Sequence, residues 1–393
     1  MLKQTFDNNA IIRVLTSKDV SRWAIFDNIL EKNDSIDSLV ESIKAKNFEI
    51  SPLKCEIKRD KPTYQATNVE DAISIKLLDR YLRRIYKVRQ SDRNRIVSQV
   101  KTLLQDSGDY AVLRLDIEKC YESMDFEKII DKLNNDTILA PSCMRLLHSI
   151  LKYCKATGIK GLPRGLAISP TLAELYLEPI DKFIKQFEGV VYYTRYVDDL
   201  FILVDRNIEY RLFEQLKTEL SNITLTLNDN SEEKKYIGPS QNANFNYLGY
   251  SFKVTPTKKK PNKVEVTISP AKLSKIKQKI AKSLHDYSKT SDIRLLQQRL
   301  NYLAVIKEIK KSKNGVLLGG IAYNYRYVSD QFNCLKALDG FLFQMIKSPK
   351  YGFTVTNISA LSKISFFGSA THQKQGKFTR KKAALINKVW KNV

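Results

Sequence analysis

The fold class predicted for this chain is α+β, with an antiparallel sheet in the middle of the sequence and helices around and after it. Residues 110–117, YAVLRLDI, alternate apolar side chains and reach an acid, as a core strand does. Residues 190–196 and 200–204 are apolar runs separated by a short turn, which predicts a hairpin. From about residue 270, apolar side chains recur at helical spacing in three basic segments.

Short helices and one strand region are predicted before residue 110. Residues 1–50 are predicted to form amphipathic helices because five apolar side chains recur near helical spacing. These are Leu30, Ile36, Leu39, Val40 and Ile43. Residues 51–65 contain two prolines and predict strand and loop. Residues 69–104 predict two helices, with Asp92 as the N-cap of the second.

After residue 117, helices alternate with loops and short strands. Residues 161–170, GLPRGLAISP, predict a loop, and Pro170 after Ser169 is expected to be the first residue of the next helix. Strands are predicted over 223–229 and 246–254. The remaining predicted helices are 125–135, 141–155, 171–187, 208–222, 272–287, 294–309 and 331–346.

The composition is that of a globular protein, but the charge is unusual. Hydrophobic residues make up 43% and charged residues 27%, which excludes a disordered chain. Only 14 Gly and 11 Pro occur, which excludes a collagen-like or linker-dominated architecture. The 66 Lys and Arg against 42 Asp and Glu give a net charge of +24, which attracts polyanions. Nucleic acid is the expected partner, with an anionic membrane surface as the alternative.

The cysteines and the N-terminal sequence indicate the cellular compartment of the protein. Five cysteines are dispersed without a CxxC pair, and only three His occur, so neither a zinc site nor a disulfide framework is expected. The first twenty residues lack the apolar core of a signal peptide, and no window of 18 apolar residues exists. The expectation is a soluble cytoplasmic protein without a membrane partner.

Three acids carry the predicted chemistry. Asp198 and Asp199 lie in the predicted hairpin turn, and Asp116 ends a core strand that can join the same sheet. Adjacent carboxylates repel, and burying them is costly unless a cation compensates the charge. Three carboxylates converging from two strands would make an oxygen-rich site suited to two Mg²⁺ ions. An Asp-Asp turn alone would more simply be a solvated turn.

The glycine-containing loop adds a second feature. Residues 161–170 hold two glycines, two prolines and Arg164, so the backbone can approach a ligand closely and the guanidinium can pair with phosphate. An ordinary connection that ends at a helix start is the alternative. The loop and the three acids together favour a nucleotidyl-transfer site.

The chain resembles a reverse transcriptase. LRLDIEKCYESMD (113–125) resembles motif A, GLPRGLAISP motif B and YVDD (196–199) motif C, in the family's order. LNDNSEEKK (227–235) resembles motif D, and NYLGYSF (246–252) resembles the primer-grip motif E. The resemblance implies a right-hand polymerase. Its divisions would be an N-terminal helical extension (1–50), fingers (51–110), a palm with the YVDD hairpin (111–255), and a helical basic thumb with a tail (256–393).

The resemblance also implies roles for individual residues. Asp116, Asp198 and Asp199 would be the catalytic metal ligands, with the backbone of Ile117 beside the metal. Tyr121 would be the steric gate against a 2′-hydroxyl, with a core tyrosine as the alternative. Other implied nucleotide or primer contacts are Leu162, Pro163, Arg164, Gly165 and Lys234 for the nucleotide, and Leu248 and Gly249 for the primer grip.

Two departures from the family pattern stand out. Arg164 occupies the position where many reverse transcriptases have Gln, which bears on nucleotide or template choice rather than on the chemistry. The fingers lack a clear match to the usual basic strands. The candidates there for triphosphate or template contact are Lys58, Arg59, Arg93 and Arg95. Lys258–Lys260, flanked by prolines, is the expected boundary before the thumb.

No integrase, RNase H or HNH-like segment accompanies the motifs, which favours a solitary prokaryotic enzyme similar to the retron and antiphage-defence groups. That likeness implies antiviral defence through DNA synthesis from dNTPs on a structured noncoding RNA template. A companion defence protein and a homo-oligomer are further expected partners. The alternatives are untemplated or protein-primed DNA synthesis, RNA-dependent RNA synthesis, and a catalytically silent RNA-binding scaffold. The basic segment 374–391 is expected to bind RNA backbone or to be a disordered tail.

Overall fold

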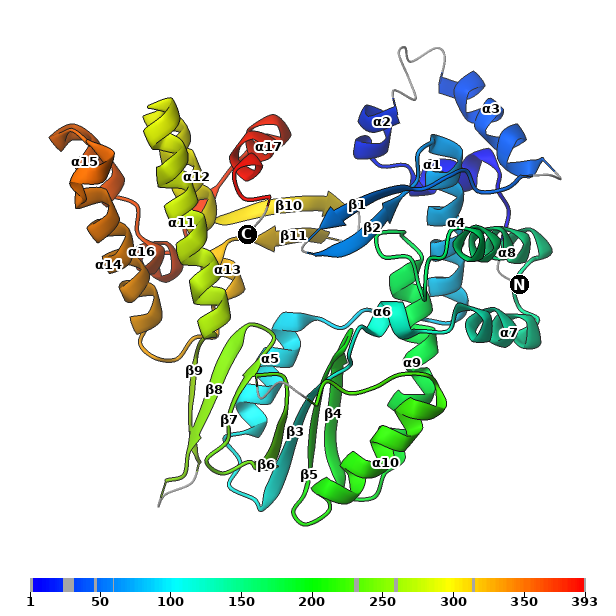
Figure 1. Ribbon diagram of the computed structural model, residues 1–393, viewed down its shortest axis with the longest axis horizontal. Helices are drawn as coiled ribbons and strands as arrows, with labels where there is room; N and C mark the ends of the chain where they lie inside the picture. The colour runs from blue at the N-terminus through cyan, green and yellow to red at the C-terminus, as the bar shows by residue number, and fades with distance from the viewer. Residues whose placement is uncertain are drawn as a thin grey trace. The chain divides into compact units, whose positions relative to one another are not determined.

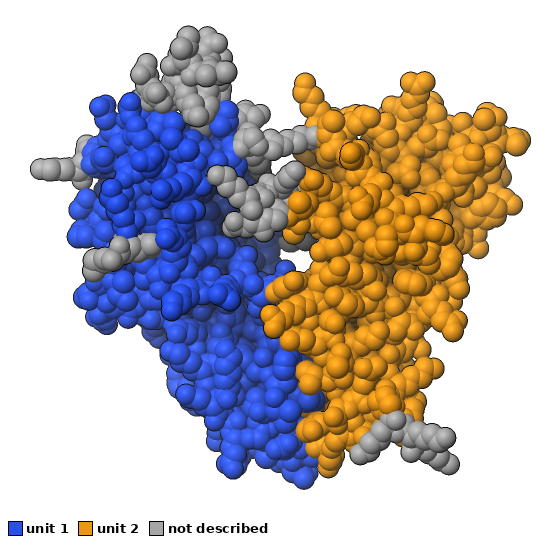
Figure 2. Space-filling view, turned by 180° about the vertical axis from the view of Figure 1, so that it is seen from behind, with its two compact units in different colours: residues 1–91, 115–231 blue, residues 92–114, 232–393 orange. Residues whose placement is uncertain are grey.

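The computed structural model describes residues 3–23, 32–45, 48–58, 60–229, 233–257, 261–312 and 315–391. It divides into two compact units, coloured separately in Figure 2. Unit 1 comprises residues 1–91 and 115–231, and unit 2 comprises residues 92–114 and 232–393. The division passes through strand β3 (Tyr110–Asp116), whose last two residues, Leu115 and Asp116, belong to unit 1.

The N-terminal part of unit 1 is built around one long helix, α4 (Figure 1). Helices α1 and α3 pack against α4, whose apolar face is fully buried at Leu77 and Leu78. Asn68 caps α4 by accepting a hydrogen bond from the Asp71 amide at 2.8 Å. The elements of this part are α1 (Asn8–Val14), α2 (Ser17–Trp23), α3 (Lys32–Lys44), β1 (Lys54–Lys58), β2 (Lys61–Gln65) and α4 (Val69–Ile85).

The rest of unit 1 carries an antiparallel hairpin and the helices around it. Strands β4 and β5 pair with Tyr196 opposite Asp199, so Val197 and Asp198 form a two-residue turn. Strand β5 is buried from Leu200 to Val204, and α9 packs against β4. The elements are α6 (Cys120–Ser123), α7 (Phe126–Asp136), α8 (Pro141–Ala156), α9 (Ser169–Gln186), β4 (Val190–Tyr196), β5 (Asp199–Asp205) and α10 (Glu209–Asn222).

Unit 2 begins with helix α5 and strands that pair antiparallel. Asp92 caps α5 by accepting from the amides of Asn94 and Arg95, as predicted. Strand β3 pairs with β6, and β7, β8 and β9 form a three-stranded sheet. The elements are α5 (Arg93–Leu103), most of β3, β6 (Tyr236–Pro239), β7 (Asn244–Tyr247), β8 (Tyr250–Thr255) and β9 (Lys263–Ile268).

The C-terminal part of unit 2 is mainly helical but also contains a small sheet of β10, β11 and β12. The segment 374–391 is ordered rather than a free tail: Trp390 is 5% exposed, and its Nε1 donates to the Lys279 carbonyl at 3.0 Å. The elements are α11 (Pro270–Thr290), α12 (Ile293–Ala304), β10 (Ile306–Ser312), β11 (Gly315–Gly319), α13 (Ile321–Asn324), α14 (Asn333–Lys347), a 3₁₀ turn (Pro349–Tyr351), α15 (Val355–Ser362), α16 (Phe366–Thr371), β12 (Gln375–Gly376) and α17 (Arg380–Lys388).

The predicted α+β class is confirmed, with four local corrections. The single strand predicted over 246–254 is instead parts of two strands, β7 and β8, separated by a turn at Leu248 and Gly249. The strand predicted over 223–229 is wrong, because only an isolated bridge between Ile117 and Leu227 forms there. The helix predicted to continue to residue 309 ends at Ala304, and β10 begins at Ile306 after an extended cap residue. Helix α9 begins one residue early, at Ser169, whose hydroxyl donates to the Pro163 carbonyl at 2.6 Å.

Two sequence features cannot be placed in this fold: one apolar residue of the predicted N-terminal helices and the predicted boundary before the thumb. Leu30 and Lys258–Lys260 lie outside the described residues. None of the helices in the described parts of the chain combines the length and the apolar composition of a membrane-spanning helix.

Candidate active site

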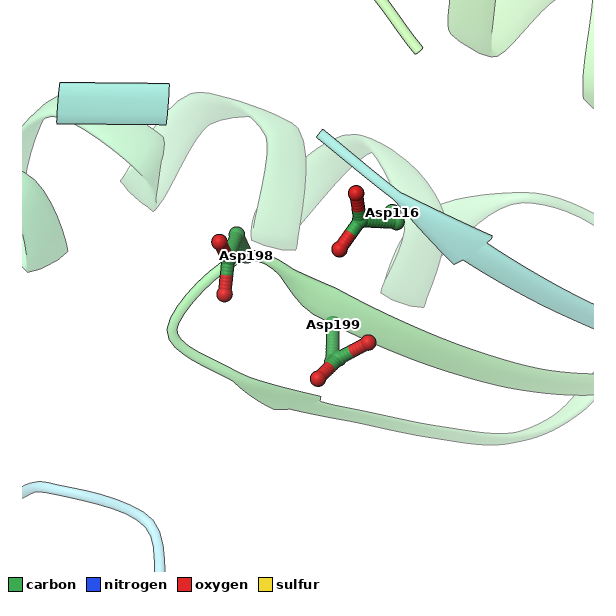
Figure 3. A group of neighbouring side chains, drawn as sticks. All are labelled: Asp116, Asp198 and Asp199. Atoms are coloured by element: carbon green, nitrogen blue, oxygen red, sulfur yellow. The ribbon is translucent and has the colours of Figure 1, made fainter. Parts of the chain in front are cut away.

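Three aspartates gather in unit 1 beside the β4–β5 turn (Figure 3). Asp116 is the last residue of β3, Asp198 lies in the turn, and Asp199 begins β5. One oxygen from each carboxylate lies within 4.8 Å of those of the other two. The Ile117 amide donates to the Asp198 carbonyl at 3.0 Å, which ties the strand to the turn. An all-oxygen donor set of this kind fits Mg²⁺.

The segment predicted to be motif D supports the same site from another side. The Asn228 amide donates to the Asp116 carbonyl at 2.8 Å, and its side-chain Nδ2 lies 3.4 Å from the Asp116 carboxylate. The Glu118 amide donates to the Thr226 carbonyl at 2.9 Å. These two backbone hydrogen bonds fix the end of β3, and with it Asp116, against the segment 226–228.

The electrostatics of the cluster favour a cation. Burial raises the pKa of Asp198, and the charge of Asp116 raises it further, whereas Arg164 and Lys61 act in the opposite direction. A carboxylate whose pKa is raised by burial and by a neighbouring acid, as that of Asp198 is, holds a proton or a metal ion more readily than an exposed acid does. The cluster therefore has the properties of a divalent-metal site.

The raised pKa of Asp198 predicts a pH-dependent stability of the metal-free protein. Because the folded-state pKa lies above the ordinary value, protonation of Asp198 stabilises the fold at low pH, and this contribution disappears as the pH rises through the raised pKa. Asp198→Asn should raise the melting temperature by a few degrees at neutral pH and not at low pH. Thermal melting in chelator measures this difference, and Mg²⁺ should remove it. A difference that does not change with pH would contradict the prediction.

The hairpin turn is held in a strained conformation. Val197 has a φ of 61°, in the left-handed region that a β-branched residue rarely adopts. Such strain costs about 1–3 kcal/mol and persists only where surrounding contacts impose it. Arg195 supplies one such contact, because its Nη1 donates to the Val197 carbonyl at 2.9 Å.

Arg195 is itself fixed by two acids of α9. Its guanidinium is 5% exposed and contacts Asp181 at 2.7 and 2.8 Å and Glu174 at 2.7 and 3.3 Å. Although burial acts in the other direction, Asp181 and Glu174 raise the pKa of Arg195 well above its ordinary value. Sequence analysis missed this residue. The available signal was a lone Arg in an aromatic strand, together with acids two helical turns apart on α9.

Arg195 is expected to act as a positioning residue. Arg195→Met would leave the half-buried carboxylates of Glu174 and Asp181 without the buried cation that pairs with them, and breaking a buried ion pair on one side costs about 3–5 kcal/mol of stability. Arg195→Lys keeps the charge but not the planar fork, so it should fold and lower kcat more than it raises KM. Denaturant unfolding and dNTP incorporation measure the two effects. A wild-type kcat in Arg195→Lys would show that the position of the β4–β5 turn does not depend on the planar guanidinium group of Arg195.

The motif B loop lies against the predicted steric gate. The Leu162 amide donates to the Tyr121 carbonyl at 2.8 Å. Arg164 pairs with Glu122 through two contacts of 2.5 and 3.0 Å, and its guanidinium lies 4.6 Å from the centre of the Tyr121 ring. Burial raises the pKa of Tyr121 to about 12, so its hydroxyl is neutral at physiological pH. Arg164, the residue that departs from the family pattern, thus packs against the ring of Tyr121.

The β1–β2 hairpin meets the same loop. The Tyr64 amide donates to the Arg164 carbonyl at 2.6 Å. Gly165 has a φ of 99°, and a Cβ there would lie 2.6 Å from the Tyr64 carbonyl oxygen, so this close approach requires glycine. Pro163 completes the loop and accepts the Ser169 hydroxyl at its carbonyl.

The hairpin presents a different cation from those predicted. Lys61, at the start of β2, acts electrostatically on both Asp198 and Glu122. Lys58 instead pairs with Glu56 at 3.2 Å, and Arg59 lies outside the described residues. The signal that could have indicated Lys61 is its place beside Pro62 at a hairpin turn, where a side chain projects from the strand pair.

The remaining predicted residues belong to unit 2. Leu248 and Gly249 form the two-residue turn between β7 and β8, with φ of 49° and 81°, as a primed hairpin turn requires. Arg93 donates to the Leu248 carbonyl at 2.6 and 2.9 Å and to the Asn324 carbonyl at 3.0 Å. Arg93 therefore holds this turn, and we do not assign it a triphosphate contact. Arg95 and Lys234 are exposed.

One known protein family matches the middle of the chain. The profile of the family "Reverse transcriptase (RNA-dependent DNA polymerase)" matches residues 65–252. This stretch includes the three aspartates, the motif B loop and the Leu248–Gly249 turn. Residues 65–252 thus match a reverse transcriptase domain, and the mixed α+β fold is the one predicted for a right-hand polymerase.

Solved structures similar to this chain include telomerases. The apo telomerase of Candida tropicalis truncated from its C-terminal domain has 12% identity and a TM-score of 0.38, covering 57% of this chain and 56% of that one. Telomerase from Candida albicans with a fragment of telomeric RNA has 10% identity and a TM-score of 0.39, covering 87% and 64%. Apo telomerase of Candida tropicalis has 12% identity and a TM-score of 0.38, covering 80% and 52%.

The chain thus spans less than two thirds of each of these telomerases. No curated protein matches the chain in sequence.

Proposed function

We propose that this protein synthesises DNA on an RNA template by nucleotidyl transfer at Asp116, Asp198 and Asp199. The observation that carries this proposal is the convergence of the three carboxylates from motifs A and C, within a segment that matches the reverse transcriptase family. The net charge of +24 supports an RNA template and a DNA product as polyanionic partners. Two Mg²⁺ ions are the proposed cofactor.

Several residues of unit 1 have separate proposed roles in nucleotidyl transfer. When bound, the metal ions would lower the pKa of the primer 3′-hydroxyl and neutralise the triphosphate. Asp116, Asp198 and Asp199 would hold the ions, while the Ile117 amide fixes the turn that carries Asp198. The 3′-oxygen forms a bond to the α-phosphorus as the bond to pyrophosphate breaks. The protein contributes position and charge rather than covalent chemistry.

Nucleotide binding is proposed for the surroundings of this cluster. Tyr121 would exclude a 2′-hydroxyl, and the loop Leu162–Gly165 would line the pocket. Lys61 is the finger cation that we propose for the triphosphate, because it already acts on Asp198. In unit 2, Lys234 would assist the departing pyrophosphate, Leu248 and Gly249 would form the primer grip, and Arg95 would contact template or triphosphate.

The biological setting that we propose is antiphage defence in a prokaryotic cytoplasm. The motifs most resemble those of defence-associated enzymes, and the strongly basic chain suits a structured noncoding RNA as template. A companion defence protein and a homo-oligomer are part of this proposal. Untemplated or protein-primed synthesis at the same carboxylates is the second candidate, favoured by the 20 tyrosines that could offer a priming hydroxyl.

Labelled dNTP incorporation by the purified protein with Mg²⁺ tests the proposal, with co-purifying RNA either kept or digested. Incorporation that requires the RNA would establish reverse transcription, and sequencing the product would name the template. Incorporation that survives RNA digestion would favour untemplated or protein-primed synthesis. Absence of incorporation, together with full biological activity of an Asp199→Asn variant, would favour the scaffold alternative.

A further inference from the structure

A cavity of about 120 Å³ lies between α1 and α4 in unit 1, and its lining is strongly basic. Arg13 reaches it from α1, Arg80 and Arg84 from α4, and Lys3 from the preceding segment. Among the lining residues that the structure describes, Asp7 is the only one with a carboxylate. Four cations around one acid leave a large local excess of positive charge.

The single acid of the lining is already occupied. The Asp7 carboxylate accepts from the Thr5 hydroxyl at 2.6 Å and the Ala10 amide at 2.9 Å, and it lies 3.7 Å from the Lys3 ammonium. These contacts lower the pKa of Asp7, so it remains ionised. Its charge offsets Lys3, whereas the three arginines remain in excess.

The arginines are placed where the helix itself does not favour them. Arg80 and Arg84 are four residues apart on one face of α4, a like-charge spacing that destabilises a helix. Neither has an acid three or four residues away on α4. Below them, Leu77 and Tyr81 are 0% and 3% exposed, and the Tyr81 hydroxyl donates to the Thr5 carbonyl. Packing therefore fixes the floor of the cavity, and Arg80 and Arg13 lie close enough to act on the Tyr81 hydroxyl.

We propose that this cavity binds a phosphate group through Arg13, Arg80 and Arg84. Guanidinium forks match the oxygens of a phosphate, and the exposed Arg13 and Arg84 and the half-buried Arg80 are accessible to a ligand from solvent. A cavity of this volume suits a single phosphate rather than a nucleic-acid groove. Two sources share this chemistry: the 5′-phosphate of an RNA, and free inorganic phosphate. The site goes beyond the polymerase chemistry, because α1 precedes the matched segment 65–252 and the three aspartates lie elsewhere in unit 1.

The test uses the full-length protein and the double variant Arg80→Gln/Arg84→Gln. Binding is measured for one RNA oligonucleotide carrying either a 5′-phosphate or a 5′-hydroxyl. Loss of two charge-assisted contacts predicts that the wild-type preference for the 5′-phosphate, about tenfold or more, disappears in the double variant. Arg145→Gln, which removes an exposed arginine of α8 outside the cavity, is the matched control and should retain the preference.

Thermal melting with inorganic phosphate distinguishes the two sources. Stabilisation of the wild type but not of the double variant by phosphate, without any 5′-end preference, would support the site and assign free phosphate as its ligand. Equal behaviour of wild type and double variant in both assays would overturn the proposal. Incorporation of dNTPs on a primed template, run in parallel, should be retained in the double variant, so failure of this inference is separable from failure of the polymerase proposal.

Discussion

Replacing Asp199 with Asn is expected to reduce dNTP incorporation by about 10³-fold or more. The substitution keeps the shape of the side chain but removes one of three charges that would hold the metal ions, and metal stabilisation of a phosphoryl transition state contributes several kcal/mol. Asp199 begins β5, directly after the strained Val197–Asp198 turn, so its backbone position should survive the change. Incorporation of labelled dNTP at saturating Mg²⁺ measures the loss.

A matched control lies on the same strand. Asp205 ends β5 and is exposed, so Asp205→Asn removes an equal charge away from the cluster and should leave incorporation near the wild-type level. Unfolding curves of both variants check that the fold is retained. Near-normal incorporation by Asp199→Asn would mean that the three aspartates are not the metal ligands, and the catalytic assignment would fail.

The central site could be predicted from sequence because its constraints are local. Asp116 follows a run of buried strand residues, and Asp198 and Asp199 directly precede another, so each carboxylate is placed by its own segment. The turn of Leu248 and Gly249, in contrast, interrupts the single strand predicted over 246–254, although Gly249 is a local signal for it, since a two-residue primed turn needs positive φ at both positions.

Other features depend on which distant residues pack together. The segment 223–229 alternates like a strand, yet Thr224 adopts a positive φ and its hydroxyl donates to the Ser123 carbonyl at 2.9 Å. The end of α12 could not be predicted from the sequence either. The helical pattern continues past Ala304, but the residues that follow form β10, because they pair with β11 and β12. In both places tertiary contacts override the local pattern.

Residues that act through others were also missed. Arg195 matters because of Glu174 and Asp181 on a different element, and Lys61 because the hairpin that carries it meets the motif B loop. The basic cavity joins Arg13 of α1 to Arg80 and Arg84 of α4, which no spacing in the sequence connects. Such sites arise from packing between segments, and only the structure brings their members together.

Replacing Tyr121 with Ala is expected to reduce discrimination against ribonucleotides by about 10- to 100-fold, the range typical of opening a pocket by one group. Tyr121→Phe keeps the ring and should keep the discrimination. Arg164 packs against the Tyr121 ring and pairs with Glu122. Arg164→Gln and Glu122→Gln should therefore reduce the discrimination against ribonucleotides by an intermediate amount, with kcat for dNTPs little changed. Single-nucleotide incorporation with dNTP and rNTP measures the ratio. Unchanged ribonucleotide use in Tyr121→Ala would favour RNA synthesis, and unchanged discrimination in Arg164→Gln would show that the ring is held without the ion pair.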